Sequence, residues 1–166
     1  MHTRAFRSRS LRRTILVRPL ADGDTTTVSA LFERPGDASR AARFHGAKPR
    51  LTRAELAHLA TVDADHHVLV AWVDGDPAPA ASARLVRSVA DGHLAEIAFE
   101  VADCYQGHGI ATALVRMLIA DARAAGITRV EGLVQPSNGA AVSLLRRVLV
   151  RVAMRYEDGA ILVSSA

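Results

Sequence analysis

Apolar residues gather in three consecutive short runs in the middle of the chain. The runs are His67–Val73, Ala80–Val86 and His93–Val101. The turn residues Asp74-Gly75-Asp76 and Asp91-Gly92 separate them, and Asp-Gly pairs between β-rich runs are typical of hairpins. The pattern therefore predicts an antiparallel meander of three strands.

The spacing of apolar residues then changes to that of a helix. Residues three or four positions apart share one helical face, and here they are Ile110, Leu114, Met117 and Leu118. Gly126 is suited to end this helix, because glycine adopts the left-handed conformation of a C′ position. Further elements are predicted after it: a strand at Arg129–Leu133, a helix capped by Asn138 and extending to about Val148, and strands at Val150–Tyr156 and Ala160–Ser164.

The front half of the chain has the pattern of one strand followed by short helices. The β-rich run Thr14–Leu20 predicts the strand, and Asp24 or Thr25 is a candidate cap for a helix that reaches Glu33. Another helical turn is expected at Ser39–Phe44. Thr52 and Glu55 have the spacing of a capping box, which predicts a helix to about Ala60. Together the elements predict an α+β domain with a helix crossing between strands in its second half.

Composition narrows the class of protein. The chain has 166 residues, 49% of them hydrophobic, and a mean hydropathy of +0.12. These values suit one folded domain, and no run reaches the roughly 18 apolar residues of a membrane span. Cys104 is the one cysteine, so neither an internal disulfide nor a multi-cysteine metal site is expected. With no secretory signal at the N-terminus, we expect a cytoplasmic protein without a membrane partner.

The net charge of +4 has a local origin. Residues 1–13 contain five arginines and no acid, and removing these five positive charges from +4 leaves −1 for residues 14–166. We therefore expect residues 1–13 to be a flexible basic tail and residues 14–166 to be a single domain. A nucleic-acid partner is not expected, because the basicity is confined to the tail.

The segment from Leu94 to Ala125 joins a strand, the turn Gln106–Ala111 and the long helix. A glycine-containing turn at a helix start presents unpaired backbone N–H groups and the positive end of the helix dipole, which suits a phosphate or pyrophosphate. The chain lacks the Gly-Lys pair of a P-loop. A dinucleotide-binding GxGxxG pattern would place Thr112 at its third glycine and would not follow an antiparallel meander.

The turn and its context resemble the GNAT N-acetyltransferase superfamily. The family's Arg/Gln-x-x-Gly-x-Gly/Ala signature is matched by Gln106, Gly109 and Ala111, and its N-x-x-A-x-x-L helix is matched from Asn138. The resemblance covers nearly the whole chain. It implies an α/β/α sandwich, with a central mixed, mostly antiparallel sheet flanked by helices. The segment Arg43–Ala71 is similar to bacterial protein-lysine acetyltransferases of the type that modifies acyl-CoA synthetases.

The resemblance implies acetyl-CoA as cosubstrate and direct acetyl transfer to a primary amine. No metal is expected, because His66, His67 and His93 show no metal-ligand spacing with a third partner. The expected acceptor is a protein lysine, with an acyl-CoA synthetase as a candidate partner. The implied cofactor-binding residues are the pyrophosphate turn (Gln106, Gly107, His108, Gly109, Ile110, Ala111), a strand edge beside the pantetheine arm (Phe99, Glu100, Val101) and Asn138 on the following helix.

Glu96 is the candidate general base. The segment Ala95–Phe99, AEIAF, resembles the AEIVF-type segment of lysine acetyltransferases, in which the glutamate is the base. A base is needed because a lysine amine with a pKa of about 10.4 is protonated at neutral pH. The apolar neighbours of Glu96 in the sequence predict partial desolvation of its carboxylate. Glu100 has the same parity and is the second candidate, with a solvent-facing role as the alternative.

Departures from the family pattern leave alternatives open. Leu145 stands where many members carry a tyrosine that protonates the leaving thiolate, and Leu149-Val150 replaces the usual Gly-Phe. The alternatives are a small-molecule amine acetyltransferase and a non-catalytic acyl-CoA sensor. Cys104 would be needed for a route through an acyl-cysteine, but it has no base beside it in the sequence.

Overall fold

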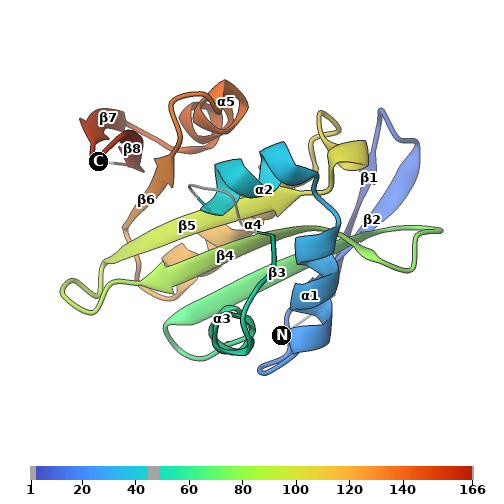
Figure 1. Ribbon diagram of the computed structural model, residues 1–166. Coiled ribbons are helices and arrows are strands. Elements are labelled where there is room, and N and C mark those ends of the chain that lie inside the picture. The colour runs from blue at the N-terminus through green and yellow to red at the C-terminus, as the bar shows by residue number, and fades with distance from the viewer. Residues whose placement is uncertain (1–2, 45–48, 166) are drawn as a thin grey trace.

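The computed structural model describes residues 3–44 and 49–165, so residues 1–2 of the expected tail and residues 45–48 of the segment Arg43–Ala71 lie outside the described residues. The described chain forms one mixed sheet flanked by helices (Figure 1). The strands are β1 Arg4–Ser8, β2 Arg13–Pro19, β3 His66–Val73, β4 Pro79–Arg87, β5 Leu94–Val101, β6 Arg129–Val134, β7 Val152–Glu157 and β8 Ala160–Ser165. The helices are α1 Thr25–Glu33, α2 Asp37–Phe44, α3 Arg53–Leu59, the 3-10 turn η1 Asp103–Tyr105, α4 Ile110–Ala124 and α5 Gly139–Val148.

The sheet has the strand order β1-β2-β3-β4-β5-β6-β8-β7. Pairing is antiparallel from β1 through β5, parallel between β5 and β6, and antiparallel again from β6 through β8 to β7. The parallel pair follows from the crossover through α4, since a parallel connection needs a helix-sized link. The predicted fold class, a mixed and mostly antiparallel sheet with flanking helices, is confirmed.

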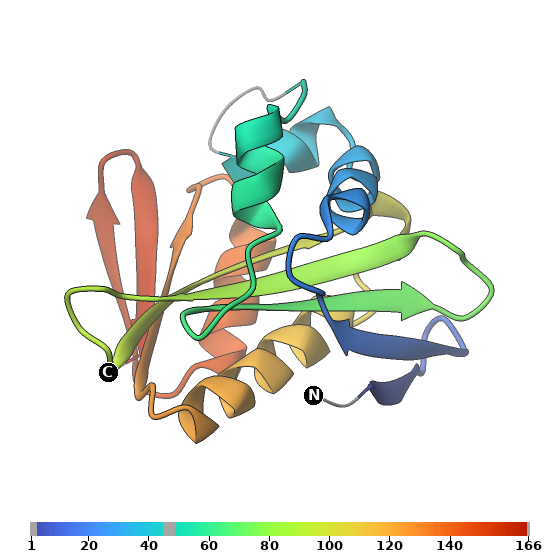
Figure 2. The ribbon, with the colours of Figure 1, turned by 90° about the horizontal axis from the view of Figure 1, so that it is seen from below.

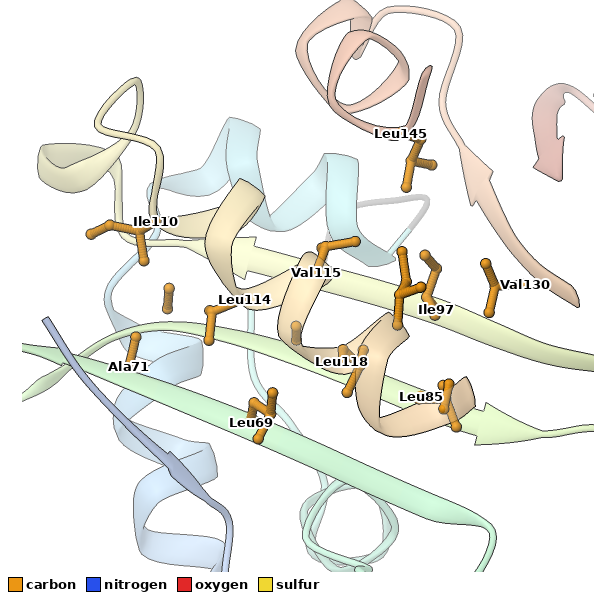
Figure 3. Close-up of a cluster of buried hydrophobic side chains, with 14 of the residues drawn as sticks. Leu69, Ala71, Leu85, Ile97, Ile110, Leu114, Val115, Leu118, Val130 and Leu145 are labelled. Atoms are coloured by element: carbon orange, nitrogen blue, oxygen red, sulfur yellow. The ribbon is translucent and has the colours of Figure 1, made fainter. Parts of the chain in front are cut away.

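Helices cover both faces of the sheet (Figure 2). On one face α4 lies against β3, β4 and β5, and the apolar side chains of helix and strands form the main core (Figure 3). Leu114 and Leu118 of α4 are fully buried in it. On the other face α1 and α3 cover a smaller core that includes Val68 and Val70 of β3. The alternation of side chains along each strand supplies both cores.

The predicted helix ends are confirmed by their caps. The Asp24 carboxylate accepts from the Thr27 amide at 3.0 Å at the start of α1. The Thr52 capping box is complete, with the Thr52 amide donating to Glu55 Oε2 at 2.8 Å and the Glu55 amide donating to Thr52 Oγ1 at 3.2 Å. Gly126 follows α4 with φ of +81°, as a C′ glycine requires.

The prediction of a flexible tail over residues 1–13 is wrong for Arg4–Ser8, which form strand β1. The strand pairs with β2 in register, from Arg4 opposite Val17 to Ser8 opposite Arg13. Its inward side chains alternate with exposed ones, and Phe6 packs against the main core while Arg4 binds Asp121 of α4 at 2.6 Å. This alternation could not be recognised in the sequence, because the charge of an arginine indicates a solvent-exposed position. Long basic side chains can nevertheless lie beside a core.

Gly132 allows β6 to lie close to β5 where their pairing ends. A methyl group on Gly132 would stand 3.2 Å from the Ile97 carbonyl oxygen and 3.1 Å from a Leu145 methyl group. The Leu145 side chain of α5 points toward Ile97 of β5 (Figure 3). A backbone carbonyl within a paired sheet cannot yield as a flexible side chain can.

We predict that Gly132→Ala lowers the free energy of unfolding by about 1–3 kcal/mol, because the added methyl group overpacks the space between β5 and α5. Gly139→Ala is the matched control, since nothing lies within 4 Å of a methyl group there and alanine favours the first turn of α5. Urea denaturation of both variants measures the difference. Equal stabilities of the two variants would contradict the close approach at Gly132.

Candidate functional site

Strands β5 and β6 separate after a short parallel pairing. They are in register only from Leu94 opposite Arg129 to Glu96 opposite Glu131, after which β6 continues along β8. On its other side β5 stays paired with β4 as far as Val101. The second half of β5 therefore has one paired edge and one open edge within the described structure.

The alternation of the β4–β5 ladder shows which backbone groups face the open edge. The Ala102 amide donates to the Ala80 carbonyl at 2.8 Å, and the Ser88 amide donates to the Leu94 carbonyl at 2.9 Å. The even-numbered residues of β5 therefore direct their backbone groups to β4, and Phe99 and Val101 direct theirs to the open edge. Glu100 differs from these two, since its backbone faces β4 and its carboxylate accepts from Ser82 Oγ at 2.9 Å.

The turn after β5 exposes a row of backbone donors. Gly107 and Gly109 have φ of +76° and +80°, so both lie in the left-handed region that favours glycine. The six amides from Gly107 to Thr112 have no hydrogen-bond acceptor among the described residues, whereas the Ala113 amide bonds to the Gly109 carbonyl at 3.1 Å. The Ile110 side chain is buried in the core and fixes the start of α4. The predicted turn is therefore a loop of free N–H groups at a helix N-terminus, where an anion is favoured.

The side chain of Gln106 anchors this loop to the neighbouring elements. Its Nε2 donates to Asp103 Oδ1 at 2.9 Å, to Ser39 Oγ at 3.2 Å and to the Val101 carbonyl at 3.3 Å. Asp103 also accepts from Ser39 Oγ at 2.7 Å and from the Gly36 amide at 2.9 Å. These bonds join the loop to α2 and to the segment before it. Gln106 could be identified from the motif, but its partners could not, since Asp103 and Ser39 are brought to it only by the fold.

A cluster of Arg34, Asp76 and Tyr105 holds the residue that precedes the loop. Asp76, in the β3–β4 turn, accepts from Arg34 at 2.7 Å and from the Tyr105 hydroxyl at 2.7 Å. The hydrogen bond from Arg34 holds the pKa of Asp76 far below its usual range, and the bond from Tyr105 adds to this effect. The bond to the Asp76 carboxylate in turn raises the pKa of Tyr105. Because Tyr105 immediately precedes Gln106, the cluster fixes the position at which the loop begins.

Glu96 lies on the face of β5 opposite α4. Its side chain is exposed and has no hydrogen-bond or ion-pair partner among the described residues. The predicted partial desolvation is therefore wrong for this structure. The apolar neighbours Ala95 and Ile97 are buried against α4, because successive strand residues point to opposite faces, so they do not cover the carboxylate.

Glu131 stands beside Glu96 as a second carboxylate. The two residues are in register across the parallel pair and therefore share a face, with backbones about 4.8 Å apart. Glu131 is half-buried and has no hydrogen-bond or ion-pair partner in the described parts of the chain. Like charges directly opposite each other destabilise a sheet, so this pair is suited to a cationic ligand. Glu131 could not be identified from the sequence, because only the strand register brings it to Glu96.

The remaining candidates have structural partners. Asn138 caps α5, with its side-chain oxygen accepting from the Ala141 amide at 3.1 Å. His108 is half-buried, and its ring bonds to Ser10. Cys104 is exposed and lies 3.8 Å from an Arg34 nitrogen. Leu145 is a core residue of α5.

The described ranges hold neither a metal cluster nor a membrane-spanning helix. No cluster of three or more His, Cys, Asp or Glu side chains with the geometry to hold a metal ion occurs there. No helix in the same ranges is long and apolar enough to cross a membrane.

The comparisons with known proteins agree with this geometry. A sequence model of the acetyltransferase (GNAT) family matches residues 32–149, more than half of the chain. The solved GNAT domain of S. lividans PAT is 27% identical with a TM-score of 0.87, over 98% of this chain and 95% of that chain. A cAMP-binding acyltransferase from Mycobacterium smegmatis is 28% identical with a TM-score of 0.69, over 99% of this chain and 46% of that chain.

A curated relative is the acetyltransferase Pat of Mycolicibacterium smegmatis. It is 40% identical over 99 residues, which are 58% of this chain and 29% of the relative. The alignment thus covers less than a third of that relative's length, and the similarity concerns one part of it.

We predict that Asp76→Asn lowers the free energy of unfolding at pH 7 by about 1–3 kcal/mol, because Arg34 and Tyr105 lose a charged partner that is mostly buried. The folded pKa of Asp76 is below its ordinary value of 3.8, so the carboxylate stabilises the fold above that pH. This contribution fades as the pH falls below 3.8 towards the folded value.

Denaturant unfolding between pH 7 and pH 2.5 measures both effects, and the gap between wild type and Asp76→Asn should narrow in acid. Asp74→Asn is the matched control, since Asp74 belongs to the same turn and its side chain is exposed. A gap that is constant across this pH range would contradict the role of the Asp76 charge.

Proposed function

The chain belongs to the acetyltransferase (GNAT) family, and we propose that it transfers the acetyl group of acetyl-CoA directly to the amine of a protein lysine. The observation that carries the proposal is the arrangement of one continuous segment. Strand β5 has an open backbone edge and a carboxylate at the point where the sheet divides, and it leads directly into the loop of free N–H groups. Bound acetyl-CoA supplies an activated thioester to the acceptor amine.

The residues of the loop fit the pyrophosphate of coenzyme A. Backbone donors from Gly107 to Thr112 lack acceptors in the described structure, and no side chain at Gly107 or Gly109 obstructs the approach. Gln106 holds the loop through its own side chain, so its amide nitrogen is a positioning group in this proposal. Preorganised donors of this kind bind an anion without reordering the chain.

The open edge of β5 fits the pantetheine arm. Phe99 offers its backbone groups, and Val101 its amide, on the side from which β6 has departed, so an amide-containing arm would continue the sheet in place of a strand. The Val101 carbonyl already accepts from Gln106 Nε2 at 3.3 Å. Glu100 bonds to Ser82 and is not assigned a contact with the arm. Asn138 remains a candidate only through its side-chain nitrogen, because its oxygen caps α5.

Glu96 is the proposed general base. It removes a proton from the lysine ammonium, since only the neutral amine can attack a carbonyl. Glu131 is the proposed partner that draws the cationic side chain to Glu96, because two unneutralised carboxylates attract an ammonium more strongly than one. The exposure of Glu96 suits a large acceptor, since a docked protein would itself remove water from the carboxylate.

Leu145 offers no proton to the leaving thiolate. A thiol has an ordinary pKa of about 8.5, so a thiolate leaves without prior protonation more readily than an alkoxide or an amide. The protein acceptor is supported by the relatives that are named Pat. An acyl-CoA synthetase is the first acceptor to test. The same assay distinguishes this function from the two alternatives, acetylation of a small amine and sensing of acyl-CoA without transfer.

We predict that Glu96→Gln lowers kcat for lysine acetylation by about 100-fold to 1,000-fold, because the amide cannot accept the proton. Calorimetry should show unchanged affinity for coenzyme A, since Glu96 lies on the face away from the loop donors. The rate is measured with an acyl-CoA synthetase and with a lysine peptide as acceptors, and it is monitored by the release of the coenzyme A thiol. Glu157→Gln, an exposed glutamate on β7, is the control.

Equal rates for Glu96→Gln and wild type would exclude Glu96 as the base. Transfer to small amines but to no protein would favour the small-molecule alternative. Tight coenzyme binding without transfer to any amine would favour the sensor.

We predict that Glu131→Gln raises the KM for the lysine acceptor by about 3-fold to 10-fold, with kcat and the KM for acetyl-CoA nearly unchanged. Its carboxylate attracts the ammonium but does not take the proton in this proposal, and an exposed or half-buried charge contact is worth about 1 kcal/mol. Initial rates at varied acceptor concentration measure the split. A fall in kcat equal to that of Glu96→Gln would instead make Glu131 part of the proton transfer.

A further inference from the structure

The turn of the N-terminal hairpin lies directly against the phosphate loop. Ser8, at the end of β1, is buried, with 3% of its surface exposed, although it is polar and next to solvent-facing arginines. Its hydroxyl donates to the His108 carbonyl at 3.2 Å and accepts from the Leu11 amide at 3.3 Å. Ser10 Oγ lies 2.9 Å from His108 Nδ1. Two serines of the turn therefore contact one residue of the loop, over a separation of about a hundred positions in the sequence.

These contacts give the hairpin a fixed position beside the loop. The Ser8 bond satisfies the His108 carbonyl, so that this acceptor does not compete for the neighbouring amides. The Ser10 bond holds the imidazole ring on the hairpin side. The turn 8–12 thus lies against one side of the loop. It carries Arg9 between the two serines and Arg12 after them.

Arg9 and Arg12 are charges without partners. Both side chains are exposed, and neither has a hydrogen bond or an ion pair among the described residues. Arg4 of the same hairpin differs, since it is neutralised by Asp121 at 2.6 Å. The two free guanidinium groups therefore raise the positive potential on the side of the loop that the serines touch.

The coenzyme carries more charge than the loop can compensate. Coenzyme A has a 3′-phosphate on its ribose in addition to the pyrophosphate, and the loop Gln106–Thr112 contains neither lysine nor arginine. Backbone amides suit the pyrophosphate, whereas a phosphate monoester is bound best by the fork of an arginine side chain. The hairpin turn hydrogen-bonds to this loop through Ser8 and Ser10, and it carries the two exposed arginines Arg9 and Arg12.

We propose that Arg9 and Arg12 form the subsite for the 3′-phosphate of coenzyme A, on a turn that Ser8 and Ser10 hold against His108. The proposal rests on the function proposed above and adds to it the way in which the chain distinguishes coenzyme A from its dephosphorylated form. It also gives the arginine-rich N-terminus a role that is independent of the acceptor.

The test compares coenzyme A with 3′-dephospho-coenzyme A by calorimetry at fixed ionic strength. The wild type should bind coenzyme A about 10-fold more tightly, as expected for a charge-assisted contact. In the double variant Arg9→Gln/Arg12→Gln this preference should vanish, because the affinity for coenzyme A falls while that for the dephosphorylated form stays the same. The control Arg50→Gln/Arg53→Gln removes two exposed arginines, one shortly before α3 and one at its first residue, and should keep the preference.

Equal affinities of the wild type for the two ligands would overturn the subsite and leave the acetyltransferase proposal intact. An equal fall for both ligands in Arg9→Gln/Arg12→Gln would also overturn it, since the arginines would then act on the pyrophosphate or on the loop. Failure of the wild type to bind either ligand would instead overturn the proposed function, and the subsite with it. Thermal unfolding of each variant shows whether the hairpin has stayed folded.

Discussion

The divergence of β6 from β5 is the constraint on which the site depends. The two strands pair only from Leu94 to Glu96 on β5, and β6 is then drawn away by its longer pairing with β8. Strand β5 cannot follow, because β4 holds one edge and Ala95 and Ile97 are packed under α4. A paired strand would otherwise satisfy the edge of β5. The open backbone groups of β5 therefore follow from two sets of interactions: β8 pairs with β6, while β4 and α4 hold β5 in place.

The same constraint determines which side chains lie on each face of the sheet. Side chains directed to α4 are apolar and fix the strand, so that the residues between them are left on the opposite face. Glu96 and Glu131 occupy the last matched position of the parallel pair, and beyond it the strands separate. The carboxylates thus stand at the divergence, while the N–H groups of the loop stand at the end of the same strand. One segment fixes the relation between the two.

Much of the fold could be predicted from local patterns, and the site only in part. Apolar periodicity and capping residues predicted the strands and helices from Thr14 onwards, since these signals are read within a few residues. Strand β1 was missed because arginines alternate with its inward residues. Glu131 and Ser8 were missed for a different reason: each acquires its role from a partner far along the chain, Glu96 and His108. The desolvation of Glu96 was wrongly predicted from sequence neighbours that the pleat turns to the other face.

The position of Leu145 shows how packing limits the chemistry. Leu145 is 1% exposed and lies over Gly132, where a single added methyl group would already stand 3.1 Å from it. A tyrosine is larger than leucine, and its hydroxyl would need a hydrogen-bond partner in this apolar contact. The close approach of α5 to β6 therefore excludes at this position the acid that many members of the family carry. In the proposed acetyl transfer, expulsion of the thiolate depends on its own stability as a leaving group. The protein contributes by positioning the thioester and by deprotonating the amine.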